Sequence, residues 1–270
     1  MTPDDATTLD SLARGLLLLE QPRNGYRFGI DAVLLGSSCG GHAPRRILDA
    51  CCGVAVIGVQ VARHHPDADL VGVEIQPALA ALAQRNLSRC QLEGRSEVLL
   101  GDLRKLDRHP ALLGRCDLVL LNPPFFPPKV GAQDTDNQRF AARHEVNGDL
   151  EALISACRSA MTPRACLKII YPAAHLSRLI ACVERAGLKA ARATTVHSFV
   201  DKKASLVLLD ALNHGRRELN ISPPLIIFEQ AGVYSPEVNA MLDGDQLCLW
   251  TRDLTPWPGS RNSDDQGSTT

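Results

Sequence analysis

The chain has 270 residues and a formal net charge of −1 at pH 7. That length suits one domain of roughly 220–250 residues with short terminal extensions. The balanced charge excludes a strongly basic nucleic-acid-binding composition, so any contact with nucleic acid must use a local patch.

Cysteine usage and hydropathy narrow the class of protein further. The nine cysteines form no C-x-x-C pair and lie mostly in apolar or helical segments, which supports neither a zinc site nor a disulfide framework. No cationic region precedes an apolar stretch at the amino terminus, and no run approaches ~18 apolar residues. We therefore expect a cytoplasmic protein with reduced cysteines, no metal and no membrane span, as a monomer or weak homodimer.

Apolar segments alternate with helical patterns along most of the chain, as in βαβ units. A leucine-rich helix is predicted first, at residues 8–20. Strands are then predicted at residues 46–52, 70–75, 96–100, 117–121 and 166–171, and helices at 54–65, 77–92, 149–161 and 173–186. Two last strands, at 192–198 and 206–211, are close enough in sequence to pair antiparallel through Asp201-Lys202-Lys203.

This order predicts an α/β, Rossmann-like fold: a seven-stranded, mostly parallel sheet with an antiparallel hairpin and helices on both faces. We expect residues 1–45 to form an amino-terminal helix and a lid segment over a cofactor. Residues 46–255 would hold the main domain, with a small extension from about residue 215 to 243. The polar, Gly/Ser-rich residues 256–270 are expected to be a disordered tail.

Asn122-Pro123-Pro124-Phe125 follows directly after the predicted strand at 117–121. In open α/β sheets, ligands bind at the carboxyl ends of the strands. The Asn side-chain oxygen and the Pro123 carbonyl can accept hydrogen bonds from an amino group, the prolines stiffen the backbone, and Phe125 can stack on a flat substrate. The motif resembles that of class I S-adenosylmethionine-dependent methyltransferases that modify adenine N6, cytosine N4 or glutamine amides. A proline-rich strand exit without chemistry is the alternative.

The segment Asp49-Ala50-Cys51-Cys52-Gly53-Val54-Ala55 stands where these methyltransferases have Asp-x-Gly-x-Gly-x-Gly. The glycines of that turn let the backbone approach the cofactor. Only Gly53 matches, since Cys51 and Ala55 replace its neighbours. We expect Asp49, Cys51, Gly53 and Ala55 to line the cofactor site, either with a shifted loop or with weakened affinity, although a tight turn without ligand would look similar.

Acidic residues follow the next two strands. Glu74 lies about 20 residues after the glycine turn, where a carboxylate accepts hydrogen bonds from ribose hydroxyls in nucleotide-binding folds. The resemblance places Asp102 near the cofactor adenine. Either side chain alone could be a solvated strand end, but their joint spacing with Asn122 favours a cofactor cleft.

A narrower resemblance covers most of the chain. The segment from Gln21 to Leu35, with Arg27-Phe28 and Asp31, is similar to the amino-terminal signature of the bacterial valine-tRNA adenine N6-methyltransferase family. Residues 142–145, 222–227 and 234–238 also resemble that family. The resemblance implies S-adenosylmethionine as cofactor and methylation of an adenine next to the anticodon of a tRNA. Phe28 and Asp31 could line the lid over the cofactor, but a core phenylalanine and a helix-capping aspartate explain them equally well.

The residues that would bind tRNA are harder to identify. We expect Arg139, Arg143, Lys202 and Lys203 to contact phosphates, although each could be ordinary solvated surface. The predicted mechanism is direct methyl transfer to an adenine turned out of its stack, with Asn122, Pro123, Pro124 and Phe125 around its amino group. The alternatives are methylation of a glutamine amide or of adenine in DNA, and a cofactor-binding module with weakened or no catalysis.

Overall fold

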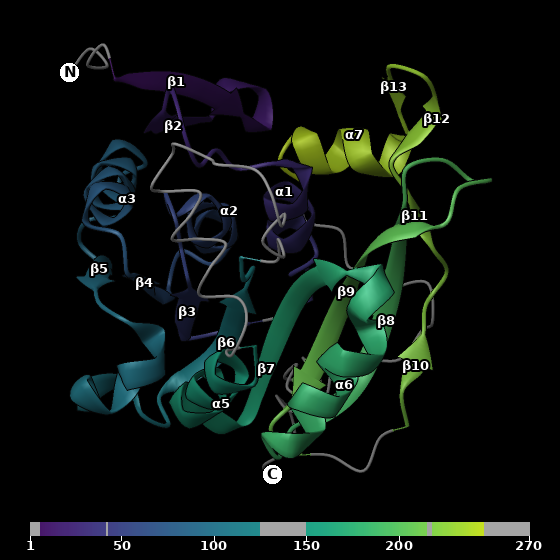
Figure 1. The fold of residues 1–270 in the computed structure, drawn as a ribbon. Coiled ribbons are helices and arrows are strands. Elements are labelled where there is room, and N and C mark those ends of the chain that lie inside the picture. The colour runs from purple at the N-terminus through teal and green to yellow at the C-terminus, as the bar shows by residue number, and fades with distance from the viewer. Residues whose placement is uncertain (1–5, 42, 125–149, 215–217, 246–270) are drawn as a thin grey trace, which may run out of the picture.

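The computed structural model describes residues 6–41, 43–124, 150–214 and 218–245, and within these a central sheet lies between two layers of helices (Figure 1). The sheet runs in the order β10-β8-β9-β7-β6-β3-β4-β5, and β11 also pairs with β8. Its main strands are β3 (Arg46–Ala50), β4 (Asp69–Glu74), β5 (Ser96–Leu100), β6 (Cys116–Leu121), β7 (Met161–Pro172), β8 (Lys189–His197) and β9 (Ala204–Leu212). The Rossmann-like architecture predicted from the sequence is confirmed.

Strand direction decides which loops share an edge of the sheet. β3 pairs in parallel with β4 and β6, and β6 pairs in parallel with β7. β9 is antiparallel to both β7 and β8, so β8 runs in the same direction as β7. β5 is parallel to β4. The carboxyl ends of β3, β4, β5, β6, β7 and β8 therefore meet at one edge, together with the turn that joins β8 to β9.

The two faces of the sheet carry separate hydrophobic cores. One face is covered by α1 (Ile30–Ser37), α2 (Val56–His64) and α3 (Pro77–Arg89). The other is covered by α5 (Leu150–Ala160), α6 (Leu176–Arg185) and the 3-10 helices η2 (Leu103–Arg108) and η3 (Pro110–Leu112), and a further 3-10 turn, η5 (Ala173–His175), precedes α6. The strands between them are apolar on both sides, as a buried parallel sheet requires.

The predicted helix at residues 8–20 is wrong, because these residues form a β-hairpin. β1 (Thr7–Leu12) pairs antiparallel with β2 (Leu17–Pro22) around a short 3-10 turn, η1 (Ala13–Gly15). Ala13, Arg14 and Gly15 all have positive φ, at 53°, 54° and 87°, which reverses the chain. The leucine spacing that suggests a helix serves instead to bury Leu17 and Leu19 against the core.

Asn86 of α3 joins this hairpin to the main domain. Its side chain is fully buried, donates to the backbone oxygens of Glu20 and Val54 at 2.9 Å each, and accepts from Glu20 N–H at 2.7 Å. The Glu20 carboxylate also pairs with Arg85 at 2.9 Å. Since Val54 belongs to the turn after β3, the hairpin is tied directly to the predicted cofactor loop.

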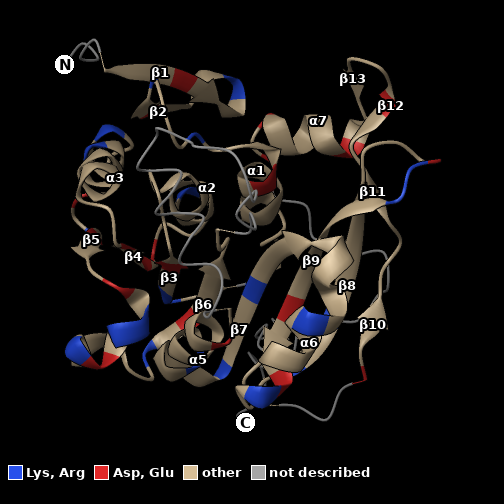
Figure 2. Ribbon diagram, in the orientation of Figure 1, with Lys and Arg blue, Asp and Glu red and all other residues tan. Residues whose placement is uncertain are grey.

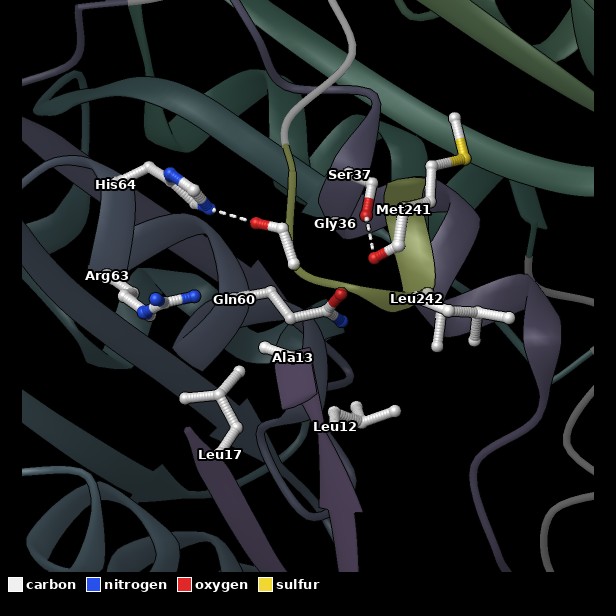
Figure 3. Close-up of a pocket in the computed structure, with 12 residues that line it drawn as sticks. Leu12, Ala13, Leu17, Gly36, Ser37, Gln60, Arg63, His64, Met241 and Leu242 are labelled. Atoms are coloured by element: carbon white, nitrogen blue, oxygen red, sulfur yellow. Dashed lines mark hydrogen bonds between the residues drawn. The ribbon is translucent and has the colours of Figure 1, made fainter. Parts of the chain in front are cut away.

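The carboxy-terminal extension packs over α1. It contains β10 (Asn220–Ile221) and β11 (Leu225–Ile226), which add two short strands to the predicted seven, then the pair β12 (Phe228–Gln230) and β13 (Val233–Tyr234), and α7 (Pro236–Leu242). Ser37 Oγ donates to the Met241 carbonyl at 3.4 Å and His64 Nε2 to the Gly244 carbonyl at 2.8 Å (Figure 3). Arg14 of the hairpin turn pairs with Asp243 at 2.5 Å. The two ends of the described chain thus meet beside α1.

Candidate active site

The turn after β3 keeps the backbone of a glycine-rich loop although two of its glycines are replaced. Cys51, Gly53 and Ala55 have φ of 59°, 57° and 65°, so all three lie in the left-handed region that favours glycine. Cys52 N–H donates to the Val73 carbonyl at 2.9 Å, which holds the turn against β4. The side chains of Cys51 and Ala55 therefore stand on a backbone with the left-handed conformations of a glycine-type loop.

Glu74 holds this turn by a hydrogen bond, and Asp49 holds the start of α2, which follows the turn. Gly53 N–H donates to Glu74 Oε2 at 2.9 Å and Gln76 N–H donates to Glu74 Oε1 at 2.8 Å. Asp49 Oδ2 accepts from Gly58 N–H at 2.8 Å, and burial is the main cause that raises the pKa of the Asp49 carboxyl to about 7. Glu74 and Gly53 therefore lie together as predicted, whereas Asp49 is directed toward the start of α2.

Tyr26, which the sequence analysis did not single out, lies over Gly53. A Cβ added to Gly53 would lie 3.0 Å from Tyr26 Cε1, so a side chain there would require the ring to move by a few tenths of an ångström. Burial raises the pKa of the Tyr26 phenol, and the nearby carboxylates of Asp31, Glu74 and Asp49 raise it further. The position is inside the Gln21–Leu35 signature, but its contact with Gly53 depends on how that segment folds back over the sheet.

Asn122 lies at the carboxyl end of β6, half-buried, and its side chain contacts α1. Asn122 Nδ2 donates to Asp31 Oδ2 at 2.8 Å. Pro123 is buried and Pro124 is exposed, while Phe125 falls outside the described residues. The structure therefore joins the motif after β6 to the amino-terminal signature, two segments 91 residues apart.

The remaining predicted cofactor residues lie around this centre. Phe28 is half-buried against the core, and its N–H donates to Gln21 Oε1 at 3.1 Å. Asp102 caps η2 by accepting from Arg104 N–H at 3.0 Å and pairs with the Arg104 guanidinium at 2.8 Å, which lowers the pKa of its carboxyl. Asp102 is thus at the predicted edge, but its carboxylate is directed to Arg104.

Of the predicted tRNA-contacting residues, the structure describes Lys202 and Lys203, and these two do not join this centre. Lys202 and Lys203 are exposed in the β8–β9 turn, and Lys202 pairs with Asp201 at 3.0 Å. The turn shares the edge of Asn122, but β7 and β9 lie between β6 and β8. Arg139 and Arg143 fall outside the described residues.

Residues 6–41, 43–124, 150–214 and 218–245 show no second candidate site in the form of a charged patch or a cluster of metal ligands. Basic and acidic residues are interspersed over the elements in this view (Figure 2). No cluster of three or more His, Cys, Asp and Glu side chains in these ranges could hold a metal ion. None of the described helices is both long and apolar enough to cross a membrane.

The residues that meet here fit a nucleotide-like cofactor. The loop is of glycine type, Gly53 packs closely beneath the Tyr26 ring, and the Glu74 carboxylate lies at the end of the neighbouring strand, as it does in nucleotide-binding sheets. Asp49 Oδ1 is buried without a hydrogen-bond partner among the described residues, which leaves one acceptor beside the turn.

Comparison with known proteins agrees with this geometry. Residues 32–146 match the methyltransferase small domain family. The chain is 33% identical over 231 residues to a tRNA1(Val) (adenine(37)-N6)-methyltransferase of Porphyromonas gingivalis, an alignment that covers 81% of this chain and 88% of that protein. Among solved structures, a predicted O-methyltransferase of Agrobacterium tumefaciens aligns with TM-score 0.64 and 23% identity, covering 79% of this chain and 96% of that one. M. jannaschii TYW2, in complex with AdoMet, aligns with TM-score 0.53 and 12% identity over 78% of this chain and 87% of that one.

Proposed function

This chain belongs to the family of tRNA1(Val) (adenine(37)-N6)-methyltransferases, and from that membership we propose that it methylates N6 of adenine 37 in a valine tRNA. It is an S-adenosylmethionine-dependent adenine N6-methyltransferase that acts on tRNA. What we propose beyond this is the identity of the tRNA, a valine tRNA, and the position of the methylated adenine, position 37.

The observation that best supports this chemistry is that Asn122 follows Leu121, which pairs with Ala50 directly before the glycine-type turn, while the NH₂ of its amide is bound by Asp31. The substrate adenine would leave its stack and enter the cleft with its amino group against Asn122 Oδ1 and the Pro123 carbonyl. Two acceptors draw the amino nitrogen toward tetrahedral geometry and expose its lone pair. Phe125 would stack on the base, and Pro124 would keep the backbone stiff.

The cofactor supplies an activated methyl group on its sulfonium, so no nucleophilic side chain or metal is required. We assign its binding to the turn of Cys51, Gly53 and Ala55, with Glu74 toward the ribose hydroxyls and Asp102 toward the adenine. Glu74 accepts backbone N–H groups of Gly53 and Gln76 at 2.9 and 2.8 Å, which fixes its carboxylate at the end of β4 beside the turn. Asp49 and Phe28 complete the proposed set, in which Asp49 accepts from Gly58 N–H near the start of α2. Asp31, expected from the sequence to line the same site, accepts from Asn122 instead.

We assign phosphate contacts to Arg139, Arg143, Lys202 and Lys203. A chain with net charge −1 has no broad positive field, so a few positioned cations must set the register of the tRNA. The enzyme would work in the cytoplasm, as a monomer or weak homodimer.

Two substitutions test the site in vitro. Asn122→Ala should lower the rate of methyl transfer on the order of 10²–10³-fold and leave S-adenosylmethionine affinity nearly unchanged, since it removes one positioned acceptor. Glu74→Ala should weaken cofactor binding about 10- to 100-fold in calorimetry, because charge-assisted hydrogen bonds are lost. A near wild-type rate for Asn122→Ala would exclude Asn122 from the reacting centre.

The function itself is tested by mass spectrometry of tRNA nucleosides from cells with and without this chain. We expect N6-methyladenosine at position 37 of a valine tRNA to disappear with the gene and to return with the wild-type chain. In parallel, purified protein is offered unmodified tRNA, duplex DNA and a glutamine-containing peptide. Methylation of DNA or peptide but not of tRNA would overturn the assignment.

A further inference from the structure

The hydrogen bond between Asn122 and Asp31 fixes which way the catalytic amide faces. A carboxylate can only accept hydrogen bonds, so the amide must present its NH₂ end to Asp31 Oδ2, and the two atoms lie 2.8 Å apart. The carbonyl oxygen is then the opposite end of the same planar group. Within the described residues this is the hydrogen bond that the Asn122 side chain makes, and no described group donates to Oδ1.

Asp31 is held in a well-defined place by its own helix. It is the second residue of α1, and residues 32–37, which follow it, are all buried. The helix is fastened on its outer side by the contact of Ser37 with Met241 of α7. A short side chain on such a helix can orient a partner with little loss of freedom.

Gly29 provides the space that this carboxylate needs. A Cβ built on Gly29 would lie 2.6 Å from Asp31 Oδ1, closer than real atoms approach. The atom that would have to move is the end of the Asp31 side chain rather than backbone. A side chain at position 29 would therefore displace Asp31 from Asn122 while the helix remains in place.

We propose that Asp31 is a positioning residue, which locks the Asn122 amide with its oxygen toward the substrate and thereby selects a 6-amino purine over a 6-oxo purine. This inference rests on the proposed function. An amino group donates two hydrogen bonds and fits an acceptor, whereas the oxo group of hypoxanthine is itself an acceptor and is repelled. A flipped amide would reverse the preference, and Asp31 prevents the flip.

The first test replaces the carboxylate by an amide. In Asp31→Asn the new side chain can donate to Asn122 Oδ1, so the Asn122 amide can turn its NH₂ toward the substrate. We expect kcat on adenosine-37 stem-loop RNA to fall about 10- to 100-fold, because the acceptor strengthens as charge develops on N6. Binding of the same RNA with inosine at position 37 should tighten relative to the adenosine RNA, and calorimetry should give S-adenosylmethionine affinity within about 2-fold of wild type.

The matched control is Asp243→Asn, which makes the same chemical change in a carboxylate that pairs with Arg14 outside the cleft. We expect it to leave kcat and the inosine-to-adenosine ratio unchanged. Asp31→Glu, which keeps an acceptor on a longer arm, should recover part of the discrimination. A purely structural role for Asp31 would not alter that ratio.

The second test moves Asp31 without changing it. Gly29→Ala should lower kcat toward the Asp31→Asn value, with only a small change in the urea midpoint of unfolding. Gly94→Ala is its control, because nothing lies within 4 Å of a Cβ added there.

Wild-type activity on the adenosine RNA is measured first, so that failure of the proposed function is seen separately. If the wild type methylates that RNA, an unchanged inosine-to-adenosine ratio in both Asp31→Asn and Gly29→Ala would overturn the positioning role. Lost cofactor binding with wild-type kcat at saturating cofactor would also overturn it and would reassign Asp31 to the cofactor.

Discussion

Cys51 holds a left-handed backbone conformation, with φ 59°, at a position where the class I methyltransferase pattern that this segment resembles has glycine. For a residue with a Cβ this conformation costs roughly 1–2 kcal/mol. Cys51→Gly should therefore raise the free energy of unfolding by up to about 1 kcal/mol, after the greater freedom of glycine in the unfolded chain is subtracted. Urea unfolding measures the gain, and calorimetry should find S-adenosylmethionine bound at least as tightly.

Gly53→Ala is the opposite change in the same turn. Gly53 has φ 57°, and an added Cβ would lie 3.0 Å from the Tyr26 ring. We expect lower stability and weaker cofactor binding than in the wild type. If Gly53→Ala were tolerated as well as Cys51→Gly, the strain argument for this turn would be wrong.

Asp49 makes the stability of the folded protein depend on pH, and the direction of this dependence follows from its raised pKa. Burial raises the pKa of its carboxyl to about 7 in the folded protein, against about 4 in the unfolded chain. Between those values the folded state keeps a proton that the unfolded state has released. The contribution of Asp49 to the free energy of unfolding therefore falls by about 1.4 kcal/mol per pH unit as pH rises from about 4 to 7. Above about pH 7 this contribution no longer changes with pH.

Asp49→Asn should remove this contribution, because the amide oxygen can still accept from Gly58 N–H. The advantage of the variant over the wild type should grow from pH 4 to pH 7 in urea unfolding. Asp67→Asn, at an exposed position, serves as the control. An advantage that is the same at pH 5 and pH 8 would contradict the raised pKa.

At the scale of elements, the amino-terminal hairpin is the part whose attachment can be tested most directly. Asn86 supplies three buried hydrogen bonds that fasten β2 and the turn after β3 to α3. Asn86→Ala leaves backbone groups of Glu20 and Val54 unpaired, which should lower the free energy of unfolding on the order of 3 kcal/mol. Trypsin should also cut faster after exposed Arg14.

Gln84→Ala on the same helix is the matched variant, since Gln84 makes one exposed contact with Val98 N–H at 3.3 Å. It should change stability little and leave cleavage at Arg14 unaltered. Equal effects of the two substitutions would mean that the hairpin is held by its leucines rather than by Asn86.

The strands of the sheet could be predicted from the sequence, whereas the amino-terminal hairpin could not. The apolar runs before Glu74 and Asn122 predicted both strands and the shared edge of their carboxyl ends, because parallel strands impose it. The hairpin could not be predicted, because Leu9, Leu12, Leu16 and Leu19 have helical spacing and the decisive feature is the positive φ of residues 13–15. The contacts of Tyr26 with Gly53 and of Asp31 with Asn122 form only when the amino-terminal segment folds back over the sheet. Local sequence patterns therefore could not predict them.

At the scale of the whole molecule, the weak net charge makes tRNA binding depend on few residues. Neutralising Lys202 and Lys203 together, as glutamines, should weaken tRNA binding and make its log–log salt slope shallower by roughly one to two units. The same is expected for Arg139 and Arg143. Cofactor affinity should not change, because the β8–β9 turn is separated from Glu74 by several strands.

Lys189→Gln is the control for this experiment, because exposed Lys189 begins β8 and therefore lies at the opposite edge of the sheet. Its salt slope should equal that of the wild type. An unchanged slope in the Lys202/Lys203 variant would show that those lysines are ordinary surface.

The contact between the amino-terminal hairpin, α1 and α2 on one side and residues 241–244 on the other has a consequence for the order in which the protein is made. Arg14 and Asp243 are 229 residues apart, Ser37 and Met241 are 204 apart, and His64 and Gly244 are 180 apart. The ribosome must therefore release almost the entire chain before the helix that carries Asp31 receives its outer cover. Until then the nascent chain can build the first strands of the sheet and hold the hairpin on α3 through Asn86, but the outer side of α1 stays accessible to proteases and chaperones. We therefore expect competence to methylate only after residues 236–244 have emerged and packed on α1.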